Sequence, residues 1–290
     1  MSIRLPSLSV VMAVKNGEQT LAEALTALAE QHYGGWWELV LVSGGSTDRT
    51  VEIAESFTDR IPNLTILASD IPAIATVAHN RGVRASSGEV IIFVDADDVV
   101  GADYLESMGK ALAVHRFVGA TMDIARLNPP ADVRRRRPLQ THLIESFCDY
   151  KPAVIGATIG VQRSAFEQVG GFDETLATLQ DLDLSWRLFD AGYRPIPVAD
   201  AVLHYRYRSE LSQIYRQQYS YGWGEVQLYR KYRHHGMPAR SLRQILGSYY
   251  RLAAALPGMV SEPGRQRVAT MAGMLAGRLS GSLKLRLVYL

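Results

Sequence analysis

The sequence lacks several features that would place it in a class directly. Cys148 is its only cysteine, which excludes an internal disulfide, so a reducing cytoplasm is the simplest location and we interpret Cys148 as a packing residue. No stretch is apolar enough for a membrane-spanning helix, and we expect no signal peptide, because no basic segment or small-residue cleavage site precedes the first apolar run. The net charge of +2 gives no electrostatic argument for a nucleic-acid partner.

Two motifs of nucleotide-binding enzymes are also missing. No Gly-x-Gly-x-x-Gly follows the first predicted strand, which argues against a dinucleotide-binding dehydrogenase. No Gly-x-x-x-x-Gly-Lys-Ser/Thr occurs, which excludes a P-loop NTPase. The chain does have 290 residues, of which 47% are hydrophobic. That is enough core for one large α/β domain, or for one domain with an appendage.

Strand and helix patterns alternate over the first hundred residues. Short apolar runs predict buried strands over 8–14, 37–42, 64–68 and 90–94, and helical spacing lies between them at 20–31, 51–54 and 73–85. This alternation predicts a doubly wound, mostly parallel sheet with right-handed crossovers. Further along, we predict strands over 117–127, 155–161 and 201–205 and helices over 162–169 and 180–191.

The fourth predicted strand ends in three carboxylates: Asp95, Asp97 and Asp98. Open α/β sheets bind ligands at the carboxyl ends of their strands. Crowded carboxylates repel one another unless a cation joins them, and hard divalent cations prefer oxygen ligands. Our hypothesis is that Asp95-Ala96-Asp97 forms a metal–diphosphate site. An acidic turn that caps a helix starting near Ala102 would explain the same residues.

Two loops at neighbouring strand ends could contact a nucleotide. They follow Val14 and Val42, and the second contains Ser43, two glycines and Ser46. Glycines let the backbone approach a ligand closely, and Ser46 is suited to be the N-cap of the next helix.

The character of the chain changes near Arg208, where it becomes helical and rich in tyrosine and arginine. We therefore divide it into a domain over 1–206 and a helical C-terminal region over 207–290. The later helices, near 241–256 and 264–283, fit an amphipathic cap or a surface that lies in a membrane interface. The arginine run 134–137 fits a solvated loop or a site for an anionic partner.

Taken together, these landmarks resemble the family 2 glycosyltransferases of the GT-A fold, over about 8–224. The resemblance rests on Asn16 after the first strand, the turn 43–48, the segment 78–82 before the acidic strand, and Gly170-Gly171-Phe172-Asp173 followed by Gln180-Asp181-Leu182-Asp183-Leu184 and Arg187. A narrower similarity, from His204 to Gly224, is to bacterial members that add sugars to lipid-linked or cell-wall acceptors.

The resemblance implies a set of site residues. Asp181 would be the catalytic base, with Asp183 as the runner-up, and Asp97 with His204 would hold Mn²⁺ or Mg²⁺; a satisfied, non-ligating histidine is the alternative for His204. The expected nucleotide-binding residues are Ala13, Val14, Asn16, Ser43, Gly44, Asn80, Asp95 and Ala96, although Asn80 could equally be structural. The expected acceptor-side residues are Gly171, Phe172, Gln180, Asp183 and Arg187.

The implied reaction is an inverting, metal-dependent transfer of a sugar from a nucleoside-diphosphate sugar to a hydroxyl of a glycan or lipid-linked acceptor. Uridine diphosphate is the favoured carrier. The implied location is the cytoplasm, with a peripheral site on the inner face of the plasma membrane as an extension, and no nucleic-acid partner is expected.

Three residues depart from the family pattern. Ser43 stands in place of an aspartate that reads the uracil ring, His79 in place of an arginine, and Gln180 in place of a glutamate. They leave open a catalytically degenerate member that binds nucleotide without turnover. A nucleotidyltransferase is a further alternative, although it expects a glycine-rich basic loop after the first strand, and Lys15-Asn16-Gly17-Glu18 is a poor version of one.

Overall fold

The structure is a computed structural model that describes residues 4–135 and 143–290 and separates into two units. Unit 1 comprises Met1–Phe147, Lys151–Glu174 and Gln180–Tyr207, and unit 2 comprises Cys148–Tyr150, Thr175–Leu179 and Arg208–Leu290. The division into domains at 206/207 stays a prediction. The arginine run 134–137 lies partly outside the described residues, so its interpretation also stays open.

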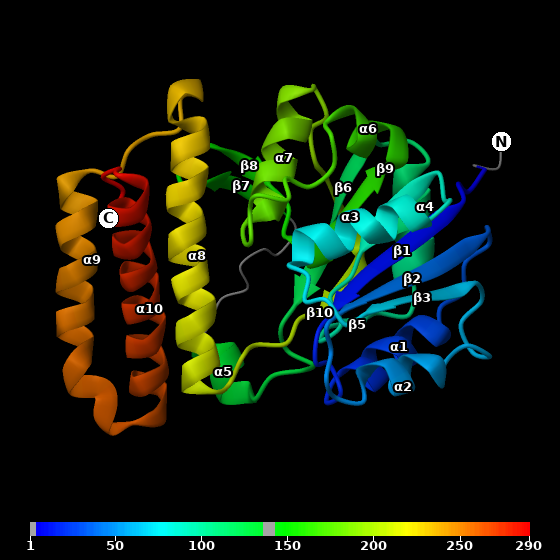
Figure 1. Ribbon diagram of the computed structural model, residues 1–290, viewed down its shortest axis with the longest axis horizontal. Helices are drawn as coiled ribbons and strands as arrows, with labels where there is room; N and C mark the ends of the chain where they lie inside the picture. The colour runs from blue at the N-terminus through cyan, green and yellow to red at the C-terminus, as the bar shows by residue number, and fades with distance from the viewer. Residues whose placement is uncertain (1–3, 136–142) are drawn as a thin grey trace. The chain divides into compact units, whose positions relative to one another are not determined.

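The first half of the sheet in unit 1 has the predicted parallel order (Figure 1). Its strands pair in the order β3-β2-β1-β4, all parallel. They are β1 (Leu8–Val14), β2 (Trp37–Gly44), β3 (Leu64–Ser69) and β4 (Val90–Phe93). β1 and β2 are buried along almost their whole length, which explains their largely apolar sequences.

The second half of the sheet is mixed. β9 (Ile159–Gln162) runs antiparallel to both β4 and β6 (Phe117–Asp123), while β10 (Ile196–His204) is parallel to β6 and antiparallel to the short β5 (Val99–Val100). The expected doubly wound, mostly parallel α/β sheet is thus confirmed, with antiparallel insertions in the region where the sequence alternation changes.

Three predicted strand boundaries were wrong. The strand expected over 201–205 begins five residues earlier and forms β10, Ile196–His204. The strand expected over 117–127 ends at Asp123, because the Asp123 carboxylate accepts the backbone N–H groups of Ala125 (3.0 Å) and Arg126 (3.4 Å) and turns the chain. The strand expected from 155 begins at Ile159, after the 3₁₀ turn η1 (Gly156–Thr158). The helix α5 (Pro130–Arg135) and the hairpin of β7 (Ile144–Phe147) and β8 (Lys151–Ala153) were not predicted.

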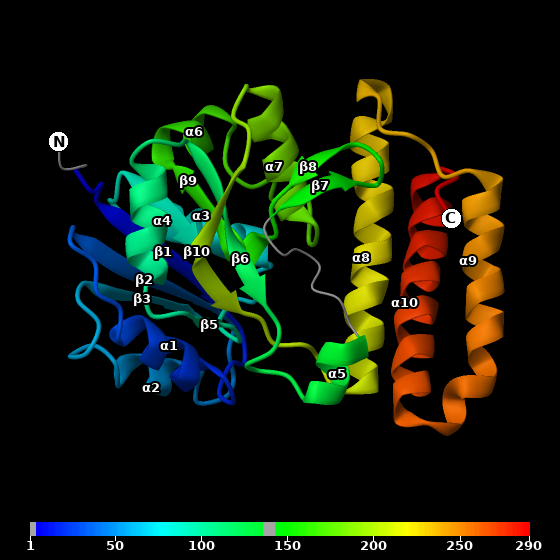
Figure 2. The same ribbon diagram turned by 180° about the vertical axis from the view of Figure 1, so that it is seen from behind.

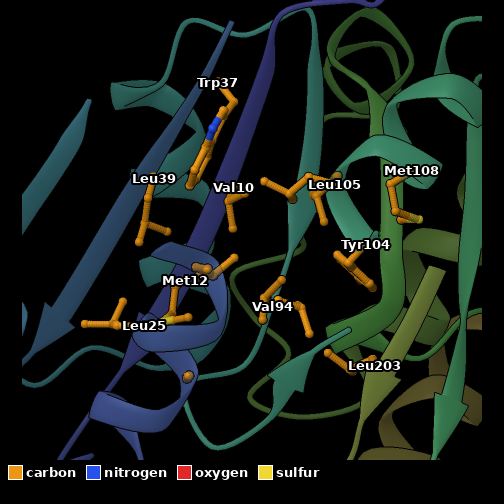
Figure 3. Packing of buried hydrophobic residues seen from close by; sticks show 14 of the residues in the cluster. Val10, Met12, Leu25, Trp37, Leu39, Val94, Tyr104, Leu105, Met108 and Leu203 are labelled. Carbon is orange, nitrogen blue, oxygen red and sulfur yellow. The ribbon is translucent and has the colours of Figure 1, made fainter. Parts of the chain in front are cut away.

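Helices cover both faces of the sheet, and the strand alternation serves two cores. Val10 and Met12 pack with α1 (Leu21–Ala29), α2 (Thr50–Glu55) and α4 (Tyr104–Leu112), as Figure 3 shows for part of this core. Val11, between them, packs on the other face with α3 (Ala75–Ala85), α6 (Arg163–Gln168) and α7 (Gln180–Asp190). A sheet buried on both faces leaves its strand ends and loops as the place for a ligand.

Unit 2 is built mainly on three helices, and α10 lies between α8 and α9 (Figures 1 and 2). They are α8 (Leu211–Tyr232), α9 (Leu242–Ala255) and α10 (Glu262–Leu285), joined by the turns η2 (Arg233–His235) and η3 (Leu256–Val260). Where α8 and α10 cross, their backbones touch, because a Cβ on Gly277 would overlap the carbonyl oxygen of Tyr219. A buried ion pair, Arg278 Nε to Glu225 Oε2 at 2.7 Å, joins the same two helices.

None of the helices within 4–135 and 143–290 is long and apolar enough to cross a membrane.

The close approach of α8 and α10 gives a stability test. Gly277→Ala should destabilise unit 2 by about 1–3 kcal/mol, because the added methyl group meets backbone rather than a flexible side chain. The matched control is Gly247→Ala in α9, where a Cβ would meet only the end of Arg251 at 3.4 Å, so the better helix former should stabilise by about 0.5–1 kcal/mol. Urea unfolding followed by far-UV circular dichroism measures both. Shifts of the same sign would contradict the packing described.

Candidate active site

The three predicted carboxylates come together directly after β4. Ligand oxygens of Asp95, Asp97 and Asp98 lie within 4.8 Å of one another. Asp98 is buried; its Oδ1 accepts the backbone N–H of Arg206 at 2.9 Å, while its Oδ2 has no hydrogen-bond partner. Burial, and then the charges of Asp97 and Asp95, raise the pKa of Asp98 well above its usual value. A buried carboxylate oxygen without a partner, beside two more carboxylates, fits a hard divalent cation.

Arg206 holds the loop that carries these carboxylates. Besides its backbone bond to Asp98, its Nε donates to the carbonyl oxygen of Asp97 at 3.0 Å, and its Nη2 pairs with Glu23 at 2.5 Å. The side chain therefore connects the segment after β10 to the acidic loop and to α1. Sequence reasoning missed Arg206 as a site residue, because its position two residues after His204 carries no signal of its own.

His204 lies at the end of β10, opposite Val99 of β5 and Asp123 of β6. Its Nδ1 bonds to Asp123 Oδ2 at 2.7 Å. Burial opposes the charge on Asp123, but this bond and two backbone N–H bonds outweigh it and lower the Asp123 pKa. Among the described residues, the group with metal-ligand spacing comprises Asp95, Asp97 and Asp98 and does not include His204. Metal ligation by His204 stays a prediction, and it would have to use Nε2.

Asp181 lies in the first turn of α7, where the helix dipole favours a carboxylate. Its Oδ2 accepts the N–H of Gly156 at 2.9 Å and its Oδ1 accepts the N–H of Leu182 at 3.0 Å. Burial raises the pKa of Asp181, and these backbone bonds only partly offset that effect. The result is an oriented carboxylate that binds a proton more readily than an exposed one.

The strand register brings Asp181 to the same edge of the sheet as the acidic loop. β9 is antiparallel to β4 and pairs Gly160 with Ile92, so the chain preceding Gly160 runs toward the carboxyl end of β4. Gly156, the partner of Asp181, lies four residues earlier in η1, and η1 contacts β4. Ala157 belongs to the same buried cluster as Val94 and Ala96.

Asp183 has a different environment, which argues for Asp181 as the base. Its side chain has no exposed surface and pairs with Arg187, whose Nε lies 2.8 Å from Asp183 Oδ2. Arg187 Nη1 also donates to the carbonyl oxygen of Val169 at 2.6 Å. Both side chains are thus engaged within the protein, and the buried Phe172 packs against Phe93 and Phe166. Acceptor contacts by these residues, by Gly171 and by Gln180 stay predictions.

The Asn80 side chain is engaged with the segment after Gly171, and a nucleotide contact by it stays a prediction. Its amide nitrogen donates to the carbonyl oxygen of Phe172 (2.8 Å) and to Glu174 (2.9 Å), and its Oδ1 accepts the N–H of Phe172 (3.0 Å). It fastens the turn at Gly171, whose φ is +69°. The neighbouring His79 is buried between Phe93 and Phe172, and burial lowers its pKa to about 4, so it is a neutral core residue near pH 7.

The loops after β1 and β2 are tied to each other. Val14 pairs with Ser43 at the strand ends, and Asn16 Oδ1 accepts the N–H of Thr47 at 2.9 Å. Asn16 itself has a φ of +53°, and its N–H donates to Ser46 Oγ at 3.1 Å. Ser43 Oγ donates to Ser46 Oγ at 2.9 Å, so its hydroxyl is engaged within the loop.

The expectation that Ser46 caps the next helix was wrong. The helix starts at Thr50, and the carboxylate of Asp48 accepts the Thr50 N–H at 3.1 Å. The other expected nucleotide-binding residues also lie at strand ends: Ala13 and Val14 end β1, Gly44 ends β2, and Ala96 follows β4. Nucleotide contacts by these residues stay predictions.

Comparisons with known proteins agree with this geometry. A family model described as "Glycosyl transferase family 2" matches residues 9–170. The chain belongs to this family. A second model, "Glycosyl transferase family group 2", matches residues 90–277 and so extends into the C-terminal helices of this family 2 glycosyltransferase.

Two curated relatives of this glycosyltransferase have low sequence identity but match most of the chain. "Glycosyltransferase AglE" of Haloferax volcanii is 25% identical over 232 residues, which span 79% of this chain and 76% of the relative. "Putative glycosyltransferase EpsE" of Bacillus subtilis is 26% identical over 222 residues, which span 74% and 78%. A shorter match, 34% identical over 111 residues and spanning 38% and 43%, is to a "PGL/p-HBAD biosynthesis glycosyltransferase" of Mycobacterium bovis.

Solved structures establish the GT-A fold. The mannosyltransferase PcManGT of Pyrobaculum calidifontis, in complex with GDP-Man and Mn²⁺, superposes with a TM-score of 0.67 at 19% identity, covering 97% of this chain and 88% of that one. TarS 1–349 of S. aureus, in complex with UDP-GlcNAc, gives a TM-score of 0.56 at 15% identity, covering 98% and 93%.

The Arg206 contacts give a test of the acidic loop. Arg206→Ala should weaken Mn²⁺-dependent binding of a nucleoside diphosphate roughly 10–100-fold, because outer partners of a metal site orient its ligands. Arg49→Ala, which removes only an exposed pair with Glu52, is the matched control and should bind normally. Titration calorimetry with and without Mn²⁺ measures both variants. Equal affinities would show that Arg206 does not position the loop.

Proposed function

We propose that this family 2 glycosyltransferase moves a sugar, with inversion, from a nucleoside-diphosphate sugar to a hydroxyl of a glycan or lipid-linked acceptor. The observation that carries the proposal is the shared edge of the sheet. It brings three clustered carboxylates after β4 and the oriented carboxylate of Asp181 to one end of the same strand. In an in-line displacement the first group serves the leaving diphosphate and the second serves the attacking hydroxyl.

The leaving diphosphate gains negative charge, and a bound divalent cation, Mn²⁺ or Mg²⁺, stabilises that charge as a Lewis acid. Asp97 would hold the cation, and Asp95 would orient the ribose or the metal-bound waters. We add Asp98 to this proposed group, because its Oδ2 is buried without a hydrogen-bond partner. His204 would contribute through Nε2 while Asp123 fixes its ring. The neighbour in complex with GDP-Man and Mn²⁺ supports this assignment.

Asp181 would accept the proton of the attacking hydroxyl. A general base works best when its pKa lies near the working pH, and burial moves the Asp181 carboxylate in that direction. The Gly156 N–H holds one carboxylate oxygen in place, which orients the group. Asp183 cannot take this role in the present conformation, because it is buried in its pair with Arg187.

For the donor we keep uridine diphosphate as the proposed carrier. Ser43 can form one hydrogen bond to the nucleotide base, where the family has a carboxylate. To do so, its hydroxyl would exchange its bond to Ser46 Oγ for a bond to the base. Solved neighbours carry both GDP-Man and UDP-GlcNAc, so a thermal-shift screen with Mn²⁺ should include both nucleoside diphosphates. A lipid-linked acceptor would place the reaction in the cytoplasm, at the inner face of the plasma membrane.

The environment of His79 weakens the case for a degenerate, nucleotide-binding member. The histidine that replaces the family arginine packs in the aromatic core against Phe93, away from the proposed catalytic groups. Release of nucleoside diphosphate from a donor sugar in the presence of Mn²⁺ tests turnover without knowledge of the acceptor. No release from any donor would favour the degenerate reading.

Removal of the proposed base should separate chemistry from binding. Asp181→Asn should lower donor turnover by two or more orders of magnitude, on the scale of general-base catalysis, while the nucleotide affinity changes little. Asp190→Asn, at the exposed end of the same helix, is the control. Near-normal turnover by Asp181→Asn in a transfer assay would refute the assignment.

The pH profile follows from the raised pKa of Asp181. A base must be deprotonated to act, so turnover should fall as the pH drops through that pKa. The acidic limb should therefore lie above the ordinary aspartate value of about 4. The limb should disappear from the residual activity of Asp181→Asn. An unchanged limb in that variant would assign it to another group.

Removal of the proposed metal ligand should affect binding as well as turnover. Asp97→Ala should abolish the increase in nucleoside-diphosphate affinity that Mn²⁺ gives to the wild-type protein. Asp103→Ala, an exposed carboxylate before α4, should retain that increase. Calorimetry at equal ionic strength, with and without Mn²⁺, reads out the difference. An Mn²⁺ response in Asp97→Ala equal to that of the wild type would exclude the metal role.

A further inference from the structure

Charge is distributed very unequally along the chain. Residues 208–290 contain 13 Lys and Arg against three Asp and Glu, a formal charge of +10, whereas residues 1–207 contain 18 against 26, a charge of −8. The near-neutral total hides this separation. A strongly basic segment attached to an acidic one indicates that the segment binds an anionic partner.

The same segment exposes apolar side chains in a regular pattern. On α9, Leu242, Leu246 and Tyr250 are 77%, 67% and 75% exposed and follow one another at intervals of four residues. Tyr249 and Ala253 lie on the same side of the helix. The buried side of α9, with Ile245 and Ser248, faces the rest of unit 2, so the exposed stripe is a second, separate face.

Further exposed apolar side chains follow α9 in the chain. Leu256, Met259 and Val260 of η3 are all exposed, the last at 90%. Arginines accompany them: Arg243 is exposed within α9, and Arg265 and Arg267 are exposed in the first turns of α10. We call this set, Leu242 to Arg267 on its exposed side, the α9 face. Its helix is firmly started, because Ser241 and Gln244 form a capping box.

We propose that the α9 face binds the surface of an anionic lipid bilayer, with α9 parallel to the membrane plane. Exposed leucine, valine and tyrosine side chains would enter the boundary between headgroups and acyl chains, and the arginines would reach lipid phosphates. Tyrosine is typical of that boundary, because its ring is apolar and its hydroxyl is polar. No helix among the described residues is able to span a bilayer, so the mode of attachment is surface binding.

Charge decides between a bilayer and a second copy of the chain. A second copy would bring another basic segment of +10 against the first, and the repulsion would oppose association. An anionic bilayer complements the arginines and also covers the aliphatic side chains, which a nucleic acid would leave in water. This inference is independent of the sugar chemistry, although a lipid-linked acceptor would give it a purpose.

The test is cosedimentation of the full chain with vesicles. Wild-type protein should bind vesicles of 30% phosphatidylglycerol in phosphatidylcholine, should bind pure phosphatidylcholine at least tenfold less, and should dissociate as salt rises. Leu246→Asp with Tyr250→Asp should lower the partition coefficient at least tenfold. Arg243→Gln with Arg267→Gln should lower it by roughly fivefold for each arginine removed. Val114→Asp, at a 62% exposed position in unit 1, is the matched control and should bind as wild type.

Nucleoside diphosphate release from soluble donor is measured on every variant. It should be unchanged, so loss of vesicle binding and loss of the proposed catalysis are separate results. The proposal would be overturned if wild-type vesicle binding did not depend on phosphatidylglycerol, or if the α9-face variants bound vesicles as well as Val114→Asp does. So would a dimer in light scattering that the same α9-face substitutions break, because a second copy would then occupy the face.

Discussion

Electrostatic repulsion among three carboxylates is the constraint on which the site depends. Asp95, Asp97 and Asp98 have ligand oxygens within 4.8 Å of one another, and Asp98 is buried. At that separation two unit charges repel by about 3 kcal/mol with an effective dielectric constant of 20. The apo protein relieves part of this by favouring the protonated form of Asp98. A divalent cation at the proposed site would relieve it more completely.

The mixed half of the sheet makes that crowding possible. β10 pairs with both β5 and β6, which brings His204, and Arg206 just after it, beside the acidic loop. β9 enters antiparallel, so that η1 precedes it at the carboxyl end of β4 and Gly156 can bind Asp181. An all-parallel sheet would have no strand entering from that edge. The antiparallel insertions therefore bring the acidic loop and Asp181, the two groups of the proposed reaction, to one edge of the sheet.

The sequence predicted elements and sites correctly where a residue pattern has one common structural role. Largely apolar runs predicted β1, β2 and β4, and clustered aspartates predicted the acidic loop. Roles that depend on a distant partner could not be predicted. Nothing near Asn80 shows that Phe172 takes up its amide, and nothing near Arg206 shows that it supports Asp97. The end of β6 at Asp123 also depends on a local side-chain bond that competes with strand propensity.

The two parts of the chain carry opposite charges, and this difference affects how each part meets an anion. Residues 1–207 carry −8, so a nucleoside diphosphate approaches a unit of its own sign and is held only where a cation reverses the local field. An anionic bilayer repels the same unit and attracts residues 208–290, which carry +10. Under the membrane proposal, the helices would therefore be attracted to the bilayer and residues 1–207 would be repelled from it. Under the proposed function, a small, charged donor would reach the acidic loop from solution, while a lipid-linked acceptor would stay at the membrane surface. The opposite charges would thus select which segment meets the bilayer, without any contact that is specific to a lipid.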